Sequence, residues 1–233
     1  MISQSFGFSY RYYKETIDKY INMDPREINF QNRVILPMLE ALLTNTGIEV
    51  VDASTLYRPS KGIKEEWYRR NGDKAVSPPD LLLVKNWNNT NMGANKVLTG
   101  GKEPEFFAAV EIKQPYSEER ICGKEMKDYA EGLMRQIEGY LDSERIEKVI
   151  LTDCFRWQFF MSEKARRDIL AGWKEERILG KKIIYSDPID FVNDKKQWKQ
   201  GGLLSEDKMT IGEPEEWNML RENLLYFLNL KGI

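Results

Sequence analysis

Two apolar segments that carry charged side chains constrain the fold of this chain most. Residues 77–84 read Ser-Pro-Pro-Asp-Leu-Leu-Leu-Val, and residues 107–113 read Phe-Ala-Ala-Val-Glu-Ile-Lys. Short apolar runs of this kind, bounded by turn-forming residues, are typical of buried strands. Successive side chains of a strand point to opposite faces, so Glu111 and Lys113 project from the same face. We expect an antiparallel pair of strands that brings Asp80 beside Glu111.

Further helices and strands follow from the spacing of the apolar residues along the rest of the chain. Pro37 falls inside one of the expected helices and predicts a kink or one lost hydrogen bond there. The expected helices span 9–22, 25–44, 123–141, 163–178 and 214–230. The expected strands span 48–57, 80–85, 106–113, 147–152, 156–161 and 182–186.

The domain organisation follows from length and composition. A chain of 233 residues can bury one substantial core, and no Ser/Gly/Pro-rich linker divides this one. We therefore expect a single domain over 1–233, with its core at about 25–161 and a C-terminal extension at 162–233 of unknown role. The expected fold class is α/β, with a central mixed sheet flanked by helices.

Composition excludes several kinds of site. The chain has no histidine, which rules out histidine acid–base catalysis, Ser-His-Asp triads and the usual zinc sites. Any catalysis must use carboxylates, lysine and a hard metal ion. No stretch approaches the roughly 18 apolar residues of a membrane span, and the start at Met1 lacks the pattern of a secretory signal. We expect a cytoplasmic protein with no membrane partner. Its net charge of −2 gives no indication of nucleic-acid binding.

Asp80 on one strand, with Glu111 and Lys113 on the next, resembles the motif of the PD-(D/E)xK nucleases. In that family the carboxylates hold Mg²⁺ and the lysine assists an attacking water. The resemblance implies that Asp80, Glu111 and the carbonyl of Ile112 bind Mg²⁺, or Mn²⁺ as a substitute, and that Lys113 orients the water. The non-catalytic alternative is that Asp80 is a turn residue and that the ExK triplet is a chance match.

Two neighbouring segments extend the resemblance to the nuclease domain of type I restriction enzyme R subunits. The first opens with Glu27, whose counterpart in that family faces the metal site; the alternative is an acid that stabilises a helix N-terminus. The second is a QxxxY element, Gln136 to Tyr140, which places both side chains on one helix face. Both side chains can then reach the same phosphate or support the catalytic strand. The alternative is a core tyrosine beside an exposed glutamine. The matches run in the expected order from Glu27 to about Phe160.

Basic residues interleaved with aromatic rings precede Asp80. Such a segment can hold a phosphate backbone and a splayed base, although a solvated loop of mixed charge fits equally well. The candidate nucleic-acid-binding residues are Lys61, Lys64, Arg69, Arg70 and Lys74.

The resemblance therefore implies a restriction-endonuclease-like core and a Mg²⁺-dependent nuclease that hydrolyses DNA, of restriction, phage or mobile-element type. Its partner would be DNA, together with a separate motor or specificity subunit, and a dimer is compatible with the sequence. Two alternatives stay open: a metal-dependent RNase, and a non-catalytic nucleic-acid-binding or assembly module on the same fold.

Overall fold

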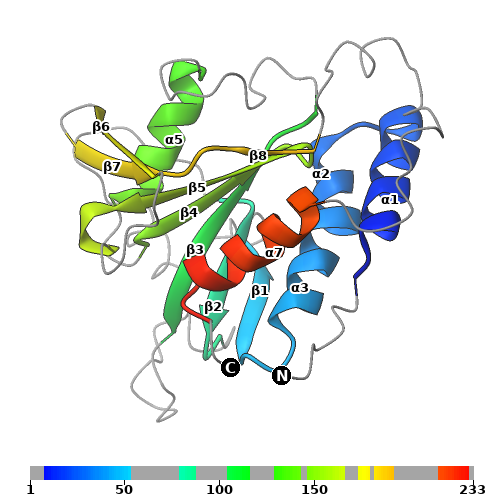
Figure 1. The fold of residues 1–233 in the computed structure, drawn as a ribbon, viewed down its shortest axis with the longest axis horizontal. Coiled ribbons are helices and arrows are strands. Elements are labelled where there is room, and N and C mark those ends of the chain that lie inside the picture. The colour runs from blue at the N-terminus through cyan, green and yellow to red at the C-terminus, as the bar shows by residue number, and fades with distance from the viewer. Residues whose placement is uncertain are drawn as a thin grey trace.

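A computed structural model describes residues 8–53, 79–87, 104–115, 129–142, 146–165, 173–178, 181–191 and 215–230. It is a mixed α/β structure with a central open sheet and helices on both faces (Figure 1). The sheet order is β1-β2-β3-β4-β5-β7-β6, and β8 pairs with β5. β3 and β4 are parallel, whereas the other pairings are antiparallel. The strands are β1 (Ile48–Asp52), β2 (Leu81–Lys85), β3 (Glu105–Ile112), β4 (Lys148–Thr152), β5 (Arg156–Ser162), β6 (Lys174–Ile178), β7 (Lys181–Tyr185) and β8 (Ile189–Asp190).

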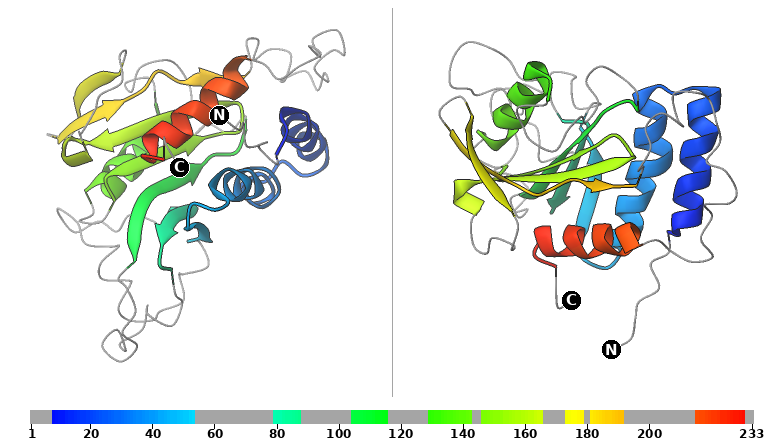
Figure 2. Two further views of the ribbon diagram at one scale, coloured as in Figure 1. Left: turned by 60° about the horizontal axis from the view of Figure 1, so that its bottom comes forward. Right: turned by 45° about the horizontal axis from the view of Figure 1, so that its top comes forward.

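Helices cover the two faces of the sheet unequally. The helices α1, α2, α3 and α7 pack on one face, and α5 packs on the other (Figure 2). Among the described residues, no helix has the length and apolar character needed to cross a membrane. The helices are α1 (Tyr10–Met23), α2 (Glu27–Phe30), a π-helical turn (Gln31–Ile35), α3 (Leu36–Leu43), a short 3₁₀ turn (Glu163–Ala165), α5 (Glu131–Leu141) and α7 (Glu215–Phe227).

The helix expected around Pro37 exists and contains one wide turn. α2, the π-helical turn and α3 follow one another without a break from residue 27 to 43. The Leu36 amide donates to the carbonyl of Gln31, five residues earlier. Proline has no amide hydrogen, and its ring clashes with the carbonyl four residues before it in a regular α-helix. The wide turn just before Pro37 lets the helix continue past the proline, where the sequence predicted a kink or a lost hydrogen bond.

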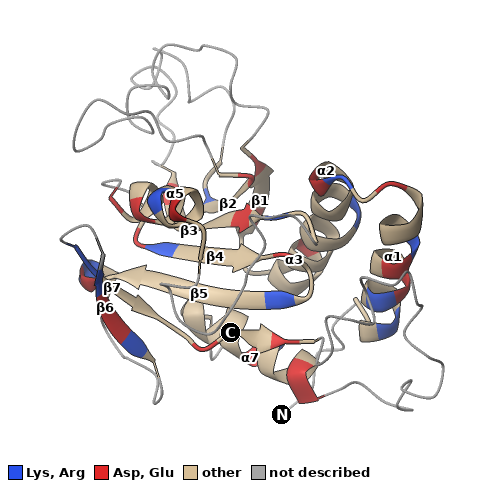
Figure 3. Ribbon diagram, turned by 90° about the horizontal axis from the view of Figure 1, so that it is seen from above, with Lys and Arg blue, Asp and Glu red and all other residues tan. Residues whose placement is uncertain are grey.

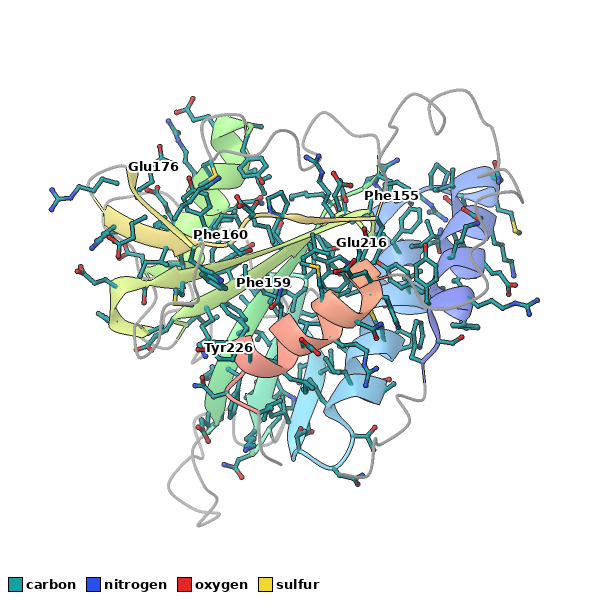
Figure 4. The ribbon with its side chains drawn as sticks, viewed as in Figure 1. Phe155, Phe159, Phe160, Glu176, Glu216 and Tyr226 are labelled. Atoms are coloured by element: carbon teal, nitrogen blue, oxygen red, sulfur yellow. The ribbon has the colours of Figure 1, made fainter. Side chains whose placement is uncertain are left out.

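Alternation along the strands separates two apolar clusters. Phe159 and Phe160 are consecutive residues of β5, and both are fully buried. Phe159 packs on Phe227 of α7, with ring centroids 5.1 Å apart, and Phe160 stacks on Tyr185 on the opposite face (Figure 4). Trp217 of α7 is also fully buried. The described part of the C-terminal extension therefore belongs to the same sheet and core as the residues before it.

Two expected elements differ from the structure, and one observed strand was not expected. The helix expected at 163–178 is wrong over 174–178, which form β6 at the sheet edge, paired along its length with β7. Residues 163–165 form a short 3₁₀ turn, and 166–172 lie outside the described residues. Strand pairing here overrides a pattern that resembled a helix. α5 begins later than expected, because Ala130 has an extended backbone and caps the helix. The sequence also gave no sign of the two-residue strand β8.

Candidate functional site

The antiparallel pairing of β2 and β3 brings Asp80 beside Glu111. Leu81 lies opposite Val110, so the residue before β2 comes level with Glu111 near the end of β3. The carboxylate of Asp80 accepts a hydrogen bond from the Ile112 amide, with Oδ2 and N 2.6 Å apart. The sequence predicted this arrangement, in which two antiparallel strands bring Asp80 beside Glu111.

Glu111 is the centre of a buried hydrogen-bond network on the α5 face. Its Oε1 lies 2.7 Å from the Nζ of Lys113, and its Oε2 accepts from the Tyr140 hydroxyl at 2.7 Å. All three residues are buried, with exposed fractions of 4% for Glu111, 5% for Lys113 and 4% for Tyr140. Period-two alternation places Glu111 and Lys113 on one face, and α5 supplies the tyrosine from above. Ile112 points to the opposite face, into the larger apolar cluster.

Glu27, the first residue of α2, approaches this network from another part of the chain. It is half-buried, and its charge acts on Asp80, Lys113 and Tyr140, raising the pKa of each. Seen from above, α2 and the strands β1, β2 and β3 lie on the same side of the molecule (Figure 3). Three acidic residues distant in sequence thus influence one another at one end of the sheet.

Burial and neighbouring acids raise the pKa of Asp80 to about 8. Burial is the largest cause, because it disfavours the charged carboxylate, and the charge of Glu111 comes next. Glu27 adds to the increase, whereas the Ile112 amide and the Lys113 ammonium oppose it. Asp80 is therefore poised to bind a proton, or a cation in its place, near neutral pH.

Lys113 and Tyr140 stay protonated in the same environment. Burial lowers the pKa of Lys113, but the charge and hydrogen bond of Glu111, followed by the charges of Glu27 and Asp80, raise it more. Burial and then the charge of Glu111 raise the pKa of Tyr140. Lys113 is consequently a cation and Tyr140 a neutral donor, and neither can serve as a general base at neutral pH in this arrangement.

The donor set suits a hard cation such as Mg²⁺, which prefers carboxylate and carbonyl oxygens. Asp80 and Glu111 supply adjacent carboxylates, and a carboxylate retains lone pairs beyond the two hydrogen bonds that Glu111 accepts. Across the residues that the structure describes, no three Asp, Glu, Cys or His side chains lie close enough together to hold an ion. The fit therefore rests on the carboxylates of Asp80 and Glu111, with Glu27 near enough to act through its charge.

The remaining predicted site residues do not join the network. Gln136 lies on α5 one turn before Tyr140 and is half-buried, and no described residue hydrogen-bonds to its side chain. The predicted nucleic-acid-binding residues lie outside the described part of the chain: Lys61, Lys64, Arg69, Arg70 and Lys74.

A second buried polar contact, between Tyr129 and Gln158, lies on the same face as the network, and the sequence analysis did not predict it. The Tyr129 hydroxyl donates to Oε1 of Gln158 on β5, and the Gln158 amide donates to the Ser186 carbonyl at 2.8 Å. Leu151 pairs with both Glu111 and Gln158, so the two polar side chains lie on the same face two strands apart. This contact fixes the segment just before α5, the helix that carries Tyr140. The available signal in the sequence was a single glutamine, Gln158, among the apolar residues of an expected strand.

Backbone contacts hold the C-terminal end of β3 in place. The Lys113 amide donates to the Thr152 carbonyl at 2.8 Å, which extends the parallel pairing of β3 and β4 by one residue. The Ala53 amide donates to the Asp80 carbonyl at 2.9 Å on the other side. Glu111 on β3 and Asp80 directly before β2 are thus held by backbone hydrogen bonds to neighbouring strands.

No protein family model, curated protein or solved structure matches this chain.

Proposed function

We propose that this chain is a Mg²⁺-dependent nuclease that hydrolyses DNA phosphodiester bonds, with a PD-(D/E)xK-type site on a restriction-endonuclease-like core. The observation that carries the proposal is the convergence of Asp80, Glu111 and Lys113 at one end of β2 and β3, with Tyr140 bound to Glu111. These residues were selected from sequence motifs alone. Their gathering around one buried network supports a common chemical task, as does the mixed sheet flanked by helices.

Each side chain has a distinct role in the proposed reaction. Asp80 and Glu111, with the carbonyl of Ile112, would hold Mg²⁺, which supplies charge neutralisation at the phosphate and activates a water. Lys113 remains cationic, so it orients that water and stabilises the negative charge that develops on phosphate oxygens. Tyr140 fixes the rotamer of Glu111 through its hydroxyl.

The test is cleavage by the purified chain with Mg²⁺ or Mn²⁺ of plasmid DNA, single-stranded DNA and RNA. Lys113→Met keeps the aliphatic stem and removes the cation, and Lys85→Met, at the other end of β2, is the matched control. We expect metal-dependent DNA cleavage whose rate falls by about 10²–10³ in Lys113→Met and is unchanged in Lys85→Met. Cleavage of RNA alone would favour the RNase alternative.

A non-catalytic binding or assembly module is the second candidate, and one observation favours it. Both carboxylate oxygens of Glu111 already accept hydrogen bonds from Lys113 and Tyr140 in a buried environment. Such a closed network is also a way to satisfy buried charges for structural reasons. DNA binding without cleavage under every metal condition would select this candidate.

A further inference from the structure

The side chain of Gln31 is buried, and its amide nitrogen makes no hydrogen bond within the described residues. Only 2% of the residue is exposed, and its amide Nε2 is buried without a hydrogen bond to any residue that the structure describes. A buried amide without a hydrogen bond destabilises a fold, and such groups are rare enough in native proteins that each calls for an explanation. An apolar side chain of the same length would fill the position without that penalty. Packing of the apolar core therefore does not explain why residue 31 is a glutamine.

Its position relative to Glu27 suggests one. The Gln31 backbone amide donates to the Glu27 carbonyl, which is the α-helical bond between residues four apart. Side chains four apart lie on the same helix face, so Gln31 follows Glu27 by one turn on the side that faces the sheet. Gln31 also begins the π-helical turn, and π-turns inside α-helices occur frequently at functional sites. The half-buried carboxylate and the unpaired amide are thus neighbours along one face.

We infer that Gln31 is a positioning residue of the candidate metal site, whose side-chain amide holds the Glu27 carboxylate, directly or through one water, when the site binds Mg²⁺ or Mn²⁺. This inference rests on the proposed function. A carboxylate near a metal needs a partner that fixes its orientation, and a neutral amide donor provides one without adding charge.

The experiment measures Mn²⁺ affinity by electron paramagnetic resonance for the wild type, Gln31→Met, Glu27→Gln and the double variant. Methionine matches glutamine in length and lacks the donor, and Gln31→Leu is a second variant should Gln31→Met not fold. Asn32→Met, on the exposed side of the same turn, is the control. We expect Gln31→Met to weaken Mn²⁺ binding about 10- to 100-fold, as the loss of an outer-shell partner does. In the Glu27→Gln background the same change should have no further effect.

The outcomes separate this inference from the proposed function. Unchanged Mn²⁺ affinity in Gln31→Met, with cleavage and binding intact in the wild type, would overturn the inference alone. So would a loss of affinity that persists undiminished without the Glu27 carboxylate. A wild type that binds no Mn²⁺ and cleaves nothing would overturn the proposed function and the inference together.

Discussion

The two faces of the sheet are built from the same strands and carry opposite chemistry at the same end. On one face, Val110 and Ile112 pack fully buried under α1, α2, α3 and α7. On the other, Glu111 and Lys113 are also buried, but they bond to each other, and Glu111 accepts a further hydrogen bond from Tyr140. Burial of apolar side chains stabilises a fold, whereas burial of a charged pair brings little or no net stability. Burial of Val110 and Ile112 therefore stabilises the fold, whereas burial of Glu111 and Lys113 is better explained by the proposed site.

The largest expected effect belongs to the apolar face. Ile112→Ala should lower the free energy of unfolding by about 2–5 kcal/mol, because it removes fully buried methyl groups from a packed core. Urea denaturation measures the loss, which should be the same with and without Mg²⁺. An exposed change such as Glu49→Ala on β1 is the control. A loss below about 0.5 kcal/mol, the range of surface substitutions, would contradict the division between the faces.

Metal binding should stabilise the polar face. The carboxylates of Asp80 and Glu111 raise each other's energy in the apo protein. Mg²⁺ or Mn²⁺ at a hundredfold excess over Kd should therefore add about 2.7 kcal/mol by mass action. Thermal melting with and without the ion measures this gain, which Asp80→Ala should lose. A melting temperature that neither ion changes would contradict the metal site.

The Tyr140 hydroxyl should contribute somewhat less. Tyr140→Phe removes only the hydrogen bond to Glu111, and a hydrogen bond to a charged group contributes about 1.5–3 kcal/mol. Urea denaturation at neutral pH should show that loss, and it should be much smaller in a Glu111→Gln background. Equal losses in both backgrounds would mean that the hydroxyl does not act through Glu111.

The pH dependence of stability should report on Asp80. Its pKa of about 8 in the folded protein exceeds the ordinary value of 3.8, so the folded state holds the proton more tightly. The stability this provides is complete below about pH 4 and is lost as the pH rises through 8. Without metal ions, the urea midpoint of the wild type should therefore fall from pH 5 to pH 8 more than that of Asp80→Asn. Parallel curves would show that Asp80 does not titrate in this range.

Sequence reasoning succeeded where a local period determines the answer. Alternation along β3 predicted that Glu111 and Lys113 share a face, and i, i+4 spacing predicted that Gln136 and Tyr140 share another. It failed where contacts across the sheet decide. Residues 174–178 form a strand because β7 pairs with them, and a charged five-residue segment carries little sign of this.

The missing parts of the site have the same origin. The contact between Tyr129 and Gln158 depends on the register of β4 and β5, which no single segment encodes. The unpaired amide of Gln31 is visible only once the helix is packed on the sheet.

The most direct test of the account is the rate of Mn²⁺-dependent DNA cleavage by Lys113→Met relative to the wild type. Removing one preorganised charged group near a reacting centre typically lowers the rate by about 10²–10³. We expect a loss of that size, with the metal-dependent increase in melting temperature retained, because Lys113 does not bind the ion. Equal cleavage by the two proteins would place the activity at another site and contradict the account.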